Sequence, residues 1–85
     1  MDIKMTEEKI KKYLCQEFLF DFNGQVGEES NLFELGLIDS YGFVQLIMFL
    51  ENESHITFMQ EELVGDSLNT YLNIVATVER KLNAE

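Results

Sequence analysis

Asp39 and Ser40 stand directly before the most apolar stretch of the chain, "YGFVQLIMFL". Aspartate is a preferred N-cap residue because its carboxylate accepts a backbone N–H of the first helical turn, so Asp39 is expected to cap a helix that begins at Ser40. The first turn of a helix also has unpaired N–H groups and the positive end of the helix dipole, which favour an anion. The Ser40 hydroxyl is therefore a suitable place for a phosphodiester, although capping alone explains the pair equally well.

Other side chains of catalytic type are too few to predict an active site. Cys15 is the only cysteine and His55 the only histidine, and no third group is placed to orient the imidazole toward a cysteine nucleophile. These two residues also leave no plausible ligand set for zinc. "DFNG" at 21–24 is similar to the start of a calcium loop but lacks the later ligands and the closing glutamate. We expect no catalysis and no dedicated metal site.

The net charge of −10 is unevenly distributed. Lysines precede Tyr13, Arg80 and Lys81 lie near the end, and every charged side chain from Tyr13 to Glu79 is acidic. Such a surface repels nucleic acid and anionic lipid and attracts basic protein surfaces. Net charge alone is equally compatible with a merely soluble acidic protein. With no leader-like segment and no apolar run long enough to span a membrane, a soluble, cytoplasmic protein is expected.

The length of 85 residues and the hydrophobic content of 46% predict one small domain over residues 1–85. The spacing of apolar side chains predicts helices, in chain order, over 6–20, 40–53, 60–63 and 66–82. Thr6 is the candidate cap of the first helix, and Ser67 or Asn69 that of the last. These elements predict an all-α bundle.

Two connections are too apolar to lie fully in water. Residues 21–38 form a long loop whose later half is rich in leucine and phenylalanine, so it is expected to pack over the core. "SHITF" at 54–58 alternates like a strand, but no second strand is available to pair with it. We therefore expect a loop that inserts Ile56 and Phe58 into the core.

The stretch "LFELGLIDSYGFVQLIMFLE", residues 32–51, resembles the acyl carrier proteins and the peptidyl and D-alanyl carrier proteins. The shared signature is an apolar loop ending in glycine, one or two apolar residues, and Asp-Ser at the head of the second helix. The order of the other segments agrees with that family from about residue 5 to 82. The resemblance implies an acyl-carrier-like four-helix bundle with a long loop between the first two helices and a short third helix.

The same resemblance implies what the chain does. Ser40 would receive 4′-phosphopantetheine from coenzyme A through a magnesium-dependent phosphopantetheinyl transferase, which Asp39 would help to engage the serine. The terminal thiol would carry an acyl or aminoacyl group as a thioester. A loading ligase would supply this cargo, and a downstream transferase or synthase with a basic surface would receive it. The chain would be a monomer and would catalyse nothing itself.

In that family the second helix is the face that partner enzymes contact. The partner contacts that the resemblance implies here are Tyr41, Phe43, Gln45, Glu51, Glu61 and Glu62. The space between the second and third helices would shelter an acyl chain. The lining that the resemblance implies for it is Val44, Leu46, Ile47 and Phe58.

The second helix departs from the fatty-acid carriers, which usually have leucine after the serine and acidic residues within this helix. Here Tyr41 and Phe43 make its first half neutral and partly aromatic, and core packing explains them as well as partner contact does. "GLIDS" and "VQL" look more like discrete D-alanyl or amino-acid carriers. Fatty-acid, polyketide, nonribosomal-peptide and D-alanine pathways stay open. The alternative function is an unmodified acidic helical module that only docks onto other proteins.

Overall fold

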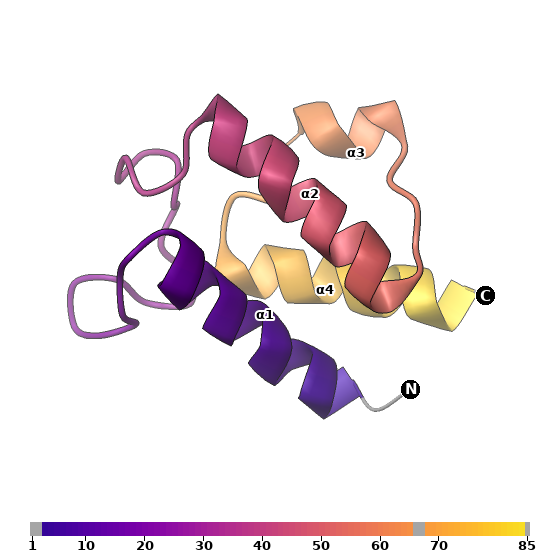
Figure 1. Cartoon of the computed structure of the whole chain (residues 1–85), viewed down its shortest axis with the longest axis horizontal. Coiled ribbons are helices and arrows are strands. Elements are labelled where there is room, and N and C mark those ends of the chain that lie inside the picture. The colour runs from indigo at the N-terminus through magenta and orange to yellow at the C-terminus, as the bar shows by residue number, and fades with distance from the viewer. Residues whose placement is uncertain (1–2, 66–67, 85) are drawn as a thin grey trace.

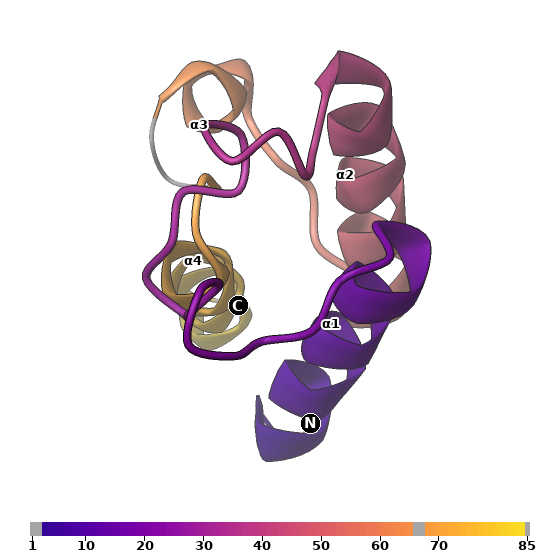
Figure 2. The ribbon, with the colours of Figure 1, turned by 90° about the vertical axis from the view of Figure 1, so that its left-hand side faces the viewer.

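The computed structural model describes residues 3–65 and 68–84, and these ranges contain helices and loops but no strand (Figure 1). The helices are α1 (Ile3–Glu17), α2 (Ser40–Ser54), α3 (Gln60–Val64) and α4 (Tyr71–Ala84). Figure 2 shows α1 and α2 next to each other on one side of the molecule, with α3 and α4 on the other. The predicted all-α fold, with a long loop before the second helix and a short third helix, is confirmed.

The hydrophobic core lies where α4 meets α1 and α2. Apolar residues recur every three or four positions in these helices, so each helix turns one apolar side inward. The large side chains with almost no exposed surface are Ile10, Leu14, Leu32, Leu46, Leu50, Leu68, Ile74 and Val78. No helix in the described part of the chain is long and apolar enough to cross a membrane.

The loop between α1 and α2 is part of the core, as predicted. Leu32 is fully buried, and its N–H donates to the carbonyl of Asn69 at 2.9 Å. Its own carbonyl accepts the N–H groups of Leu37 at 3.0 Å and Ile38 at 3.3 Å. The loop is therefore tied to the segment before α4, and this tie lies only a few residues ahead of α2.

The connection between α2 and α3 inserts Ile56 and Phe58 into the core, which confirms that prediction. α2 ends at Ser54, and its C-cap His55 has a φ of 55°, in the left-handed region. Glu51 then fastens the connection to α2, because its Oε2 accepts the N–H of Phe58 at 3.0 Å.

The predicted limits of the first helix are wrong. α1 runs from Ile3 to Glu17, so Thr6 lies inside the helix and does not cap it. The helix ends early because Leu19 takes a left-handed φ of 57° and the N–H of Phe20 returns to the carbonyl of Cys15 at 3.2 Å. This is the geometry of a Schellman cap, in which glycine is the usual residue.

The predicted start of the last helix is also wrong. α4 begins at Tyr71, and the Oγ1 of Thr70 accepts the N–H of Asn73 at 3.1 Å. Thr70 is therefore the N-cap in place of Asn69, whose carbonyl bonds to the loop at Leu32. The other candidate, Ser67, lies outside the described residues.

Candidate functional site

Asp39 is the N-cap of α2, as predicted from the sequence. Its backbone is extended, and its Oδ1 accepts the N–H of Gly42 at 2.8 Å. Its carbonyl accepts the N–H of Phe43, also at 2.8 Å, which starts the helical hydrogen bonds. One residue therefore ends the loop and begins the helix, so the first helical position falls on Ser40.

The turn before Asp39 is built by local contacts. The Oδ1 of Asn31 accepts the N–H groups of Phe33 and Glu34, each at 3.0 Å. Gly36 has a φ of +77°, a conformation that glycine adopts without steric cost. Ile38 is then buried directly before Asp39. The cap is thus held from one side by the core and from the other by α2.

Ser40 is exposed at the N-terminal edge of α2. It occupies the first position of α2, where the backbone N–H groups of the first turn and the helix dipole stabilise negative charge. α2 carries no charged side chain before Glu51, so no acid of this helix opposes a phosphate at its start. An accessible primary alcohol at such a place fits a group attached through a phosphodiester.

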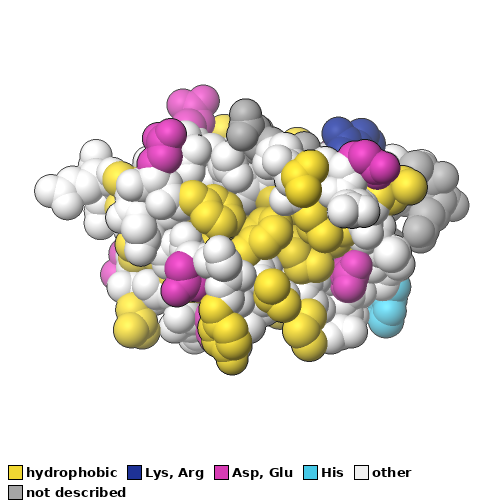
Figure 3. All heavy atoms as spheres, turned by 90° about the horizontal axis from the view of Figure 1, so that it is seen from above, with side chains coloured by type: hydrophobic (Ala, Val, Ile, Leu, Met, Phe, Trp, Pro, Cys, Tyr) yellow, Lys and Arg dark blue, Asp and Glu magenta, His cyan; other side chains and the backbone are white. Residues whose placement is uncertain are grey.

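α2 also turns an apolar face to solvent. Tyr41, Val44 and Met48 are 73%, 56% and 57% exposed, and their spacing of three and four residues puts them on one side of the helix. Figure 3 shows hydrophobic side chains gathered in the middle of the face seen from above, with acidic side chains around them. The sequence analysis did not single out Met48. Its spacing from Tyr41 and Val44 places it on the exposed side of α2 once the buried side is known.

The neighbouring aromatic residues of α2 face in different directions. Tyr41 points outward, whereas Phe43 is half-buried with its ring centroid 5.4 Å from that of Phe33. Gln45 is half-buried as well. Core packing therefore accounts for Phe43, while Tyr41 is available to a partner.

The predicted acidic contacts are also divided. Glu61 is exposed, but Glu51 bonds to the connection between α2 and α3. The Oε1 of Glu62 accepts hydrogen bonds from Lys81 Nζ at 2.7 Å and from the N–H of Met59 at 2.8 Å. Both bonds lower the pKa of the Glu62 carboxyl below its ordinary value, and the bond from Lys81 has the larger effect. The pair with Lys81 fastens α3 to α4.

The four residues predicted to line an acyl pocket differ in how far they are buried. Leu46 and Phe58 are buried members of the core, and Ile47 is half-buried against it. Val44 lies on the outer face of α2. Three of the four side chains therefore face the interior, and the fourth belongs to the apolar face beside Tyr41.

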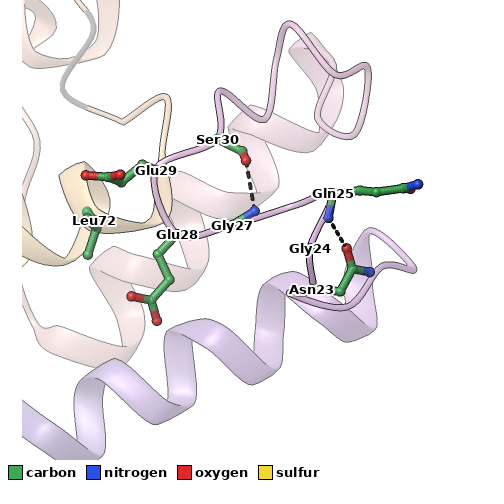
Figure 4. Close-up of a pocket in the computed structure, with 8 residues that line it drawn as sticks. All are labelled: Asn23, Gly24, Gln25, Gly27, Glu28, Glu29, Ser30 and Leu72. Atoms are coloured by element: carbon green, nitrogen blue, oxygen red, sulfur yellow. Dashed lines mark hydrogen bonds between the residues drawn. The ribbon is translucent and has the colours of Figure 1, made fainter.

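A large open hollow of about 550 Å³ lies elsewhere, between residues 23–30 and Leu72 of α4 (Figure 4). Two hydrogen bonds shape this part of the loop: Asn23 Oδ1 accepts the N–H of Gln25 at 2.7 Å, and Ser30 Oγ accepts that of Gly27 at 2.8 Å. Within the described ranges, no three His, Cys, Asp or Glu residues are grouped to hold a metal ion. The hollow is therefore lined by a folded turn of this loop and by Leu72.

Comparison with known proteins gives matches over nearly the whole chain, although no family model matches the sequence. The chain is 34% identical over 84 residues to the D-alanyl carrier protein of Streptococcus mutans, which covers 99% of this chain and 100% of that protein. Identity to the D-alanyl carrier protein of Streptococcus sanguinis is 37% with the same coverage. It is 29% over 76 residues to the "Probable acyl carrier protein PigG" of a Serratia species, covering 89% of this chain and 87% of that protein.

Proposed function

The chain belongs to the family of D-alanyl and acyl carrier proteins, and we propose that Ser40 is the residue through which it carries its cargo. The observation that supports this most is the exposed Ser40 hydroxyl at the first position of α2, directly after the cap formed by Asp39. In carrier proteins a serine-linked 4′-phosphopantetheine supplies a thiol that holds the cargo as a thioester. Ser40 is where this chain would hold that group.

In the attachment reaction, Ser40 Oγ attacks the phosphorus of coenzyme A that bears the pantetheine. A new P–O bond forms to Ser40, and the bond from that phosphorus to the bridging pyrophosphate oxygen breaks. Adenosine 3′,5′-bisphosphate leaves, and the hydroxyl proton passes to a base of the phosphopantetheinyl transferase, which also supplies the magnesium ion. Asp39 holds the first turn of α2 in place during this step. The transferase supplies the catalysis.

The proposed cargo is a small aminoacyl group, with D-alanine as the first candidate. Relatives that span the whole chain are named D-alanyl carrier proteins. The interior of this chain agrees with a small cargo, because Leu46 and Phe58 lie buried in the core. A long acyl chain placed between α2 and α3 would have to displace such side chains, whereas an aminoacyl group needs no apolar chamber.

Partner enzymes would dock on the apolar face of Tyr41, Val44 and Met48, next to Ser40. Protein interfaces typically have an apolar centre and a polar rim. The charged side chains of α2 and α3 are all acidic: Glu51, Glu53, Glu61 and Glu62. A second copy of the chain is a poor occupant because two molecules of net charge −10 repel each other. The expected partner therefore presents an apolar patch bordered by lysine or arginine.

Loading of the phosphopantetheinylated protein tests this function. The protein is first modified with coenzyme A, magnesium and a broad-specificity transferase, and is then incubated with ATP, labelled D-alanine and the adenylating ligase of a D-alanyl carrier system. We expect label on the wild-type protein that hydroxylamine releases, and none on Ser40→Ala.

Two other outcomes would contradict the proposed cargo or the proposed carrier function. Loading by a fatty acid and its ligase, with no loading by an amino acid, would overturn the proposed cargo. If the wild type takes up no cargo while Ser40→Ala keeps full biological activity, the unmodified docking module is the better explanation.

A further inference from the structure

Gly42 lies in the first turn of α2, two residues after Ser40, and it is buried. A Cβ at this position would lie 2.6 Å from Cε1 and 3.3 Å from Cζ of Phe18, and 3.3 Å from Asp39 Oδ1. Carbon atoms pack favourably at about 3.5–4.0 Å, so the shortest of these distances is a clash. Only a residue without a side chain lets Phe18 and the capping carboxylate take their places together.

The ring of Phe18 also belongs to a row of aromatic contacts. It meets Tyr13 edge to face, with ring centroids 6.2 Å apart and an interplanar angle of 87°. Tyr13 is in turn stacked on Phe49 at 4.0 Å and 10°. Because Phe49 belongs to α2, this row of rings starts at the first turn of α2 and returns to the same helix about two turns later. A shift of the Phe18 ring away from Gly42 would therefore disturb its contact with Tyr13.

We propose that Phe18 and Gly42 form a positioning contact that fixes the first turn of α2, and with it the direction of the Ser40 hydroxyl toward the transferase. The inference rests on the proposed attachment at Ser40. A methyl group at position 42 would press both on the Phe18 ring and on the carboxylate of Asp39, the residue before Ser40. Misplacing a reacting atom by about 1 Å can cost a rate factor on the order of 10². Both residues would act through the first turn of α2 and not on the reacting atoms, so they are positioning residues.

The effect of Gly42→Ala on the rate of attachment distinguishes this contact from ordinary helix propensity. Replacing glycine by alanine inside a helix normally stabilises the helix, because alanine loses less conformational freedom on folding. Propensity alone therefore predicts that Gly42→Ala leaves the reaction unchanged in a slightly more stable protein. The contact with Phe18 predicts slower attachment.

The test compares the kcat/KM of phosphopantetheine transfer for wild type, Gly42→Ala, Phe18→Ala and the double variant. All four are assayed with a broad-specificity transferase at a temperature where circular dichroism shows each to be folded. We expect Gly42→Ala to lower kcat/KM by about 10- to 100-fold in the wild-type background. In the Phe18→Ala background the same change is expected to cost less than about threefold, because the 2.6 Å contact is gone and only the milder 3.3 Å approach to Asp39 Oδ1 is left. The matched control is Gly24→Ala, since a Cβ there meets nothing within 4 Å.

The double variant distinguishes positioning from stability. Loss of the Phe18 ring lowers the Tm, so a merely structural role predicts that the double variant reacts no faster than Gly42→Ala. The positioning contact predicts that it is less stable than the wild type and nevertheless reacts faster than Gly42→Ala. Equal rates for wild type and Gly42→Ala, or no rescue, would overturn this inference and leave the proposed function intact. A wild-type chain that gains no phosphopantetheine would instead overturn the proposed function.

Discussion

Oδ1 of Asp39 lies 2.8 Å from the backbone nitrogen of Gly42, and this hydrogen bond fixes the point at which the long loop becomes α2. The bond joins Asp39 to Gly42, so Ser40 lies between the two bonded residues in the chain. The position of Ser40 therefore depends on this local contact, to which the Phe18 ring packed against Gly42 adds a second one.

Asp39→Ala is expected to lower the free energy of unfolding by about 0.5–2 kcal/mol, because the cap of α2 is lost. Asp39→Asn keeps a side-chain oxygen that accepts the same N–H, so its stability should stay close to that of the wild type. Urea denaturation measures both. If Asp39→Asn is as stable as the wild type but gains phosphopantetheine as slowly as Asp39→Ala, the transferase requires the negative charge of Asp39 in addition to the helix cap.

Leu32→Ala is expected to lower the free energy of unfolding by about 2–5 kcal/mol, because it removes a fully buried side chain from the loop. Leu35→Ala, in the same loop, should change it by less than about 0.5 kcal/mol, because Leu35 is 49% exposed. Thermal or urea unfolding of the two variants makes the comparison. Equal losses would show that the loop is not anchored through Leu32.

Glu62→Gln is expected to be less stable than the wild type at pH 7, and the difference should vanish in acid. The pKa of Glu62 is lowered in the folded state, chiefly by the hydrogen bond from Lys81. Its stabilisation is therefore complete above the unfolded pKa of about 4.3 and is lost as the pH falls through the lower folded value. Unfolding curves between neutral pH and pH of about 2 measure this.

The matched control for Glu62 is Glu61→Gln, because Glu61 lies on the same short helix with an exposed carboxylate. Its effect on stability should change little over the same pH range. A Glu62→Gln difference that persists unchanged at the acid end would contradict the ion pair as its cause.

Val44→Ser and Met48→Ser are each expected to weaken binding to the loading ligase by about tenfold, since each removes apolar contact area from a docking face. Stability should hardly change, because both side chains are more than half exposed. Leu72→Ser is the control, an exposed apolar residue on α4. Isothermal titration calorimetry at two salt concentrations measures the affinity of each variant for the ligase. If Glu61→Lys abolishes binding and the two serine variants do not, docking is ionic and the apolar face is not the contact.

The start of α2 could be predicted from the sequence because the Asp39 cap joins residues three positions apart. The buried loop and the inserted Ile56 and Phe58 could also be predicted, since their side chains are too apolar for water. The end of α1 could not, because its left-handed residue is Leu19 where glycine is usual. The features that could be predicted follow ordinary residue preferences. The end of α1 does not, because leucine rarely adopts the left-handed conformation that Leu19 has.

The direction in which each side of α2 faces could not be predicted either. The helix is apolar around much of its circumference, so its sequence does not separate Tyr41, which is exposed, from Phe43, which packs on Phe33. The hydrogen bonds of Glu51 and Glu62 could not be predicted for a related reason. Glu51 bonds seven residues along the chain and Glu62 nineteen, and only the packing of the helices brings these groups together.

The mass of the intact protein after reaction with coenzyme A, magnesium and a broad-specificity transferase tests the central claim most directly. A carrier protein known to be a substrate is included in the same tube to show that the transferase is active. We expect the wild type to gain the mass of one phosphopantetheine, with the added group on the peptide that contains Ser40, and Ser40→Ala to gain nothing. An equal gain by Ser40→Ala, or no gain by the wild type while the known carrier is modified, would contradict attachment at Ser40.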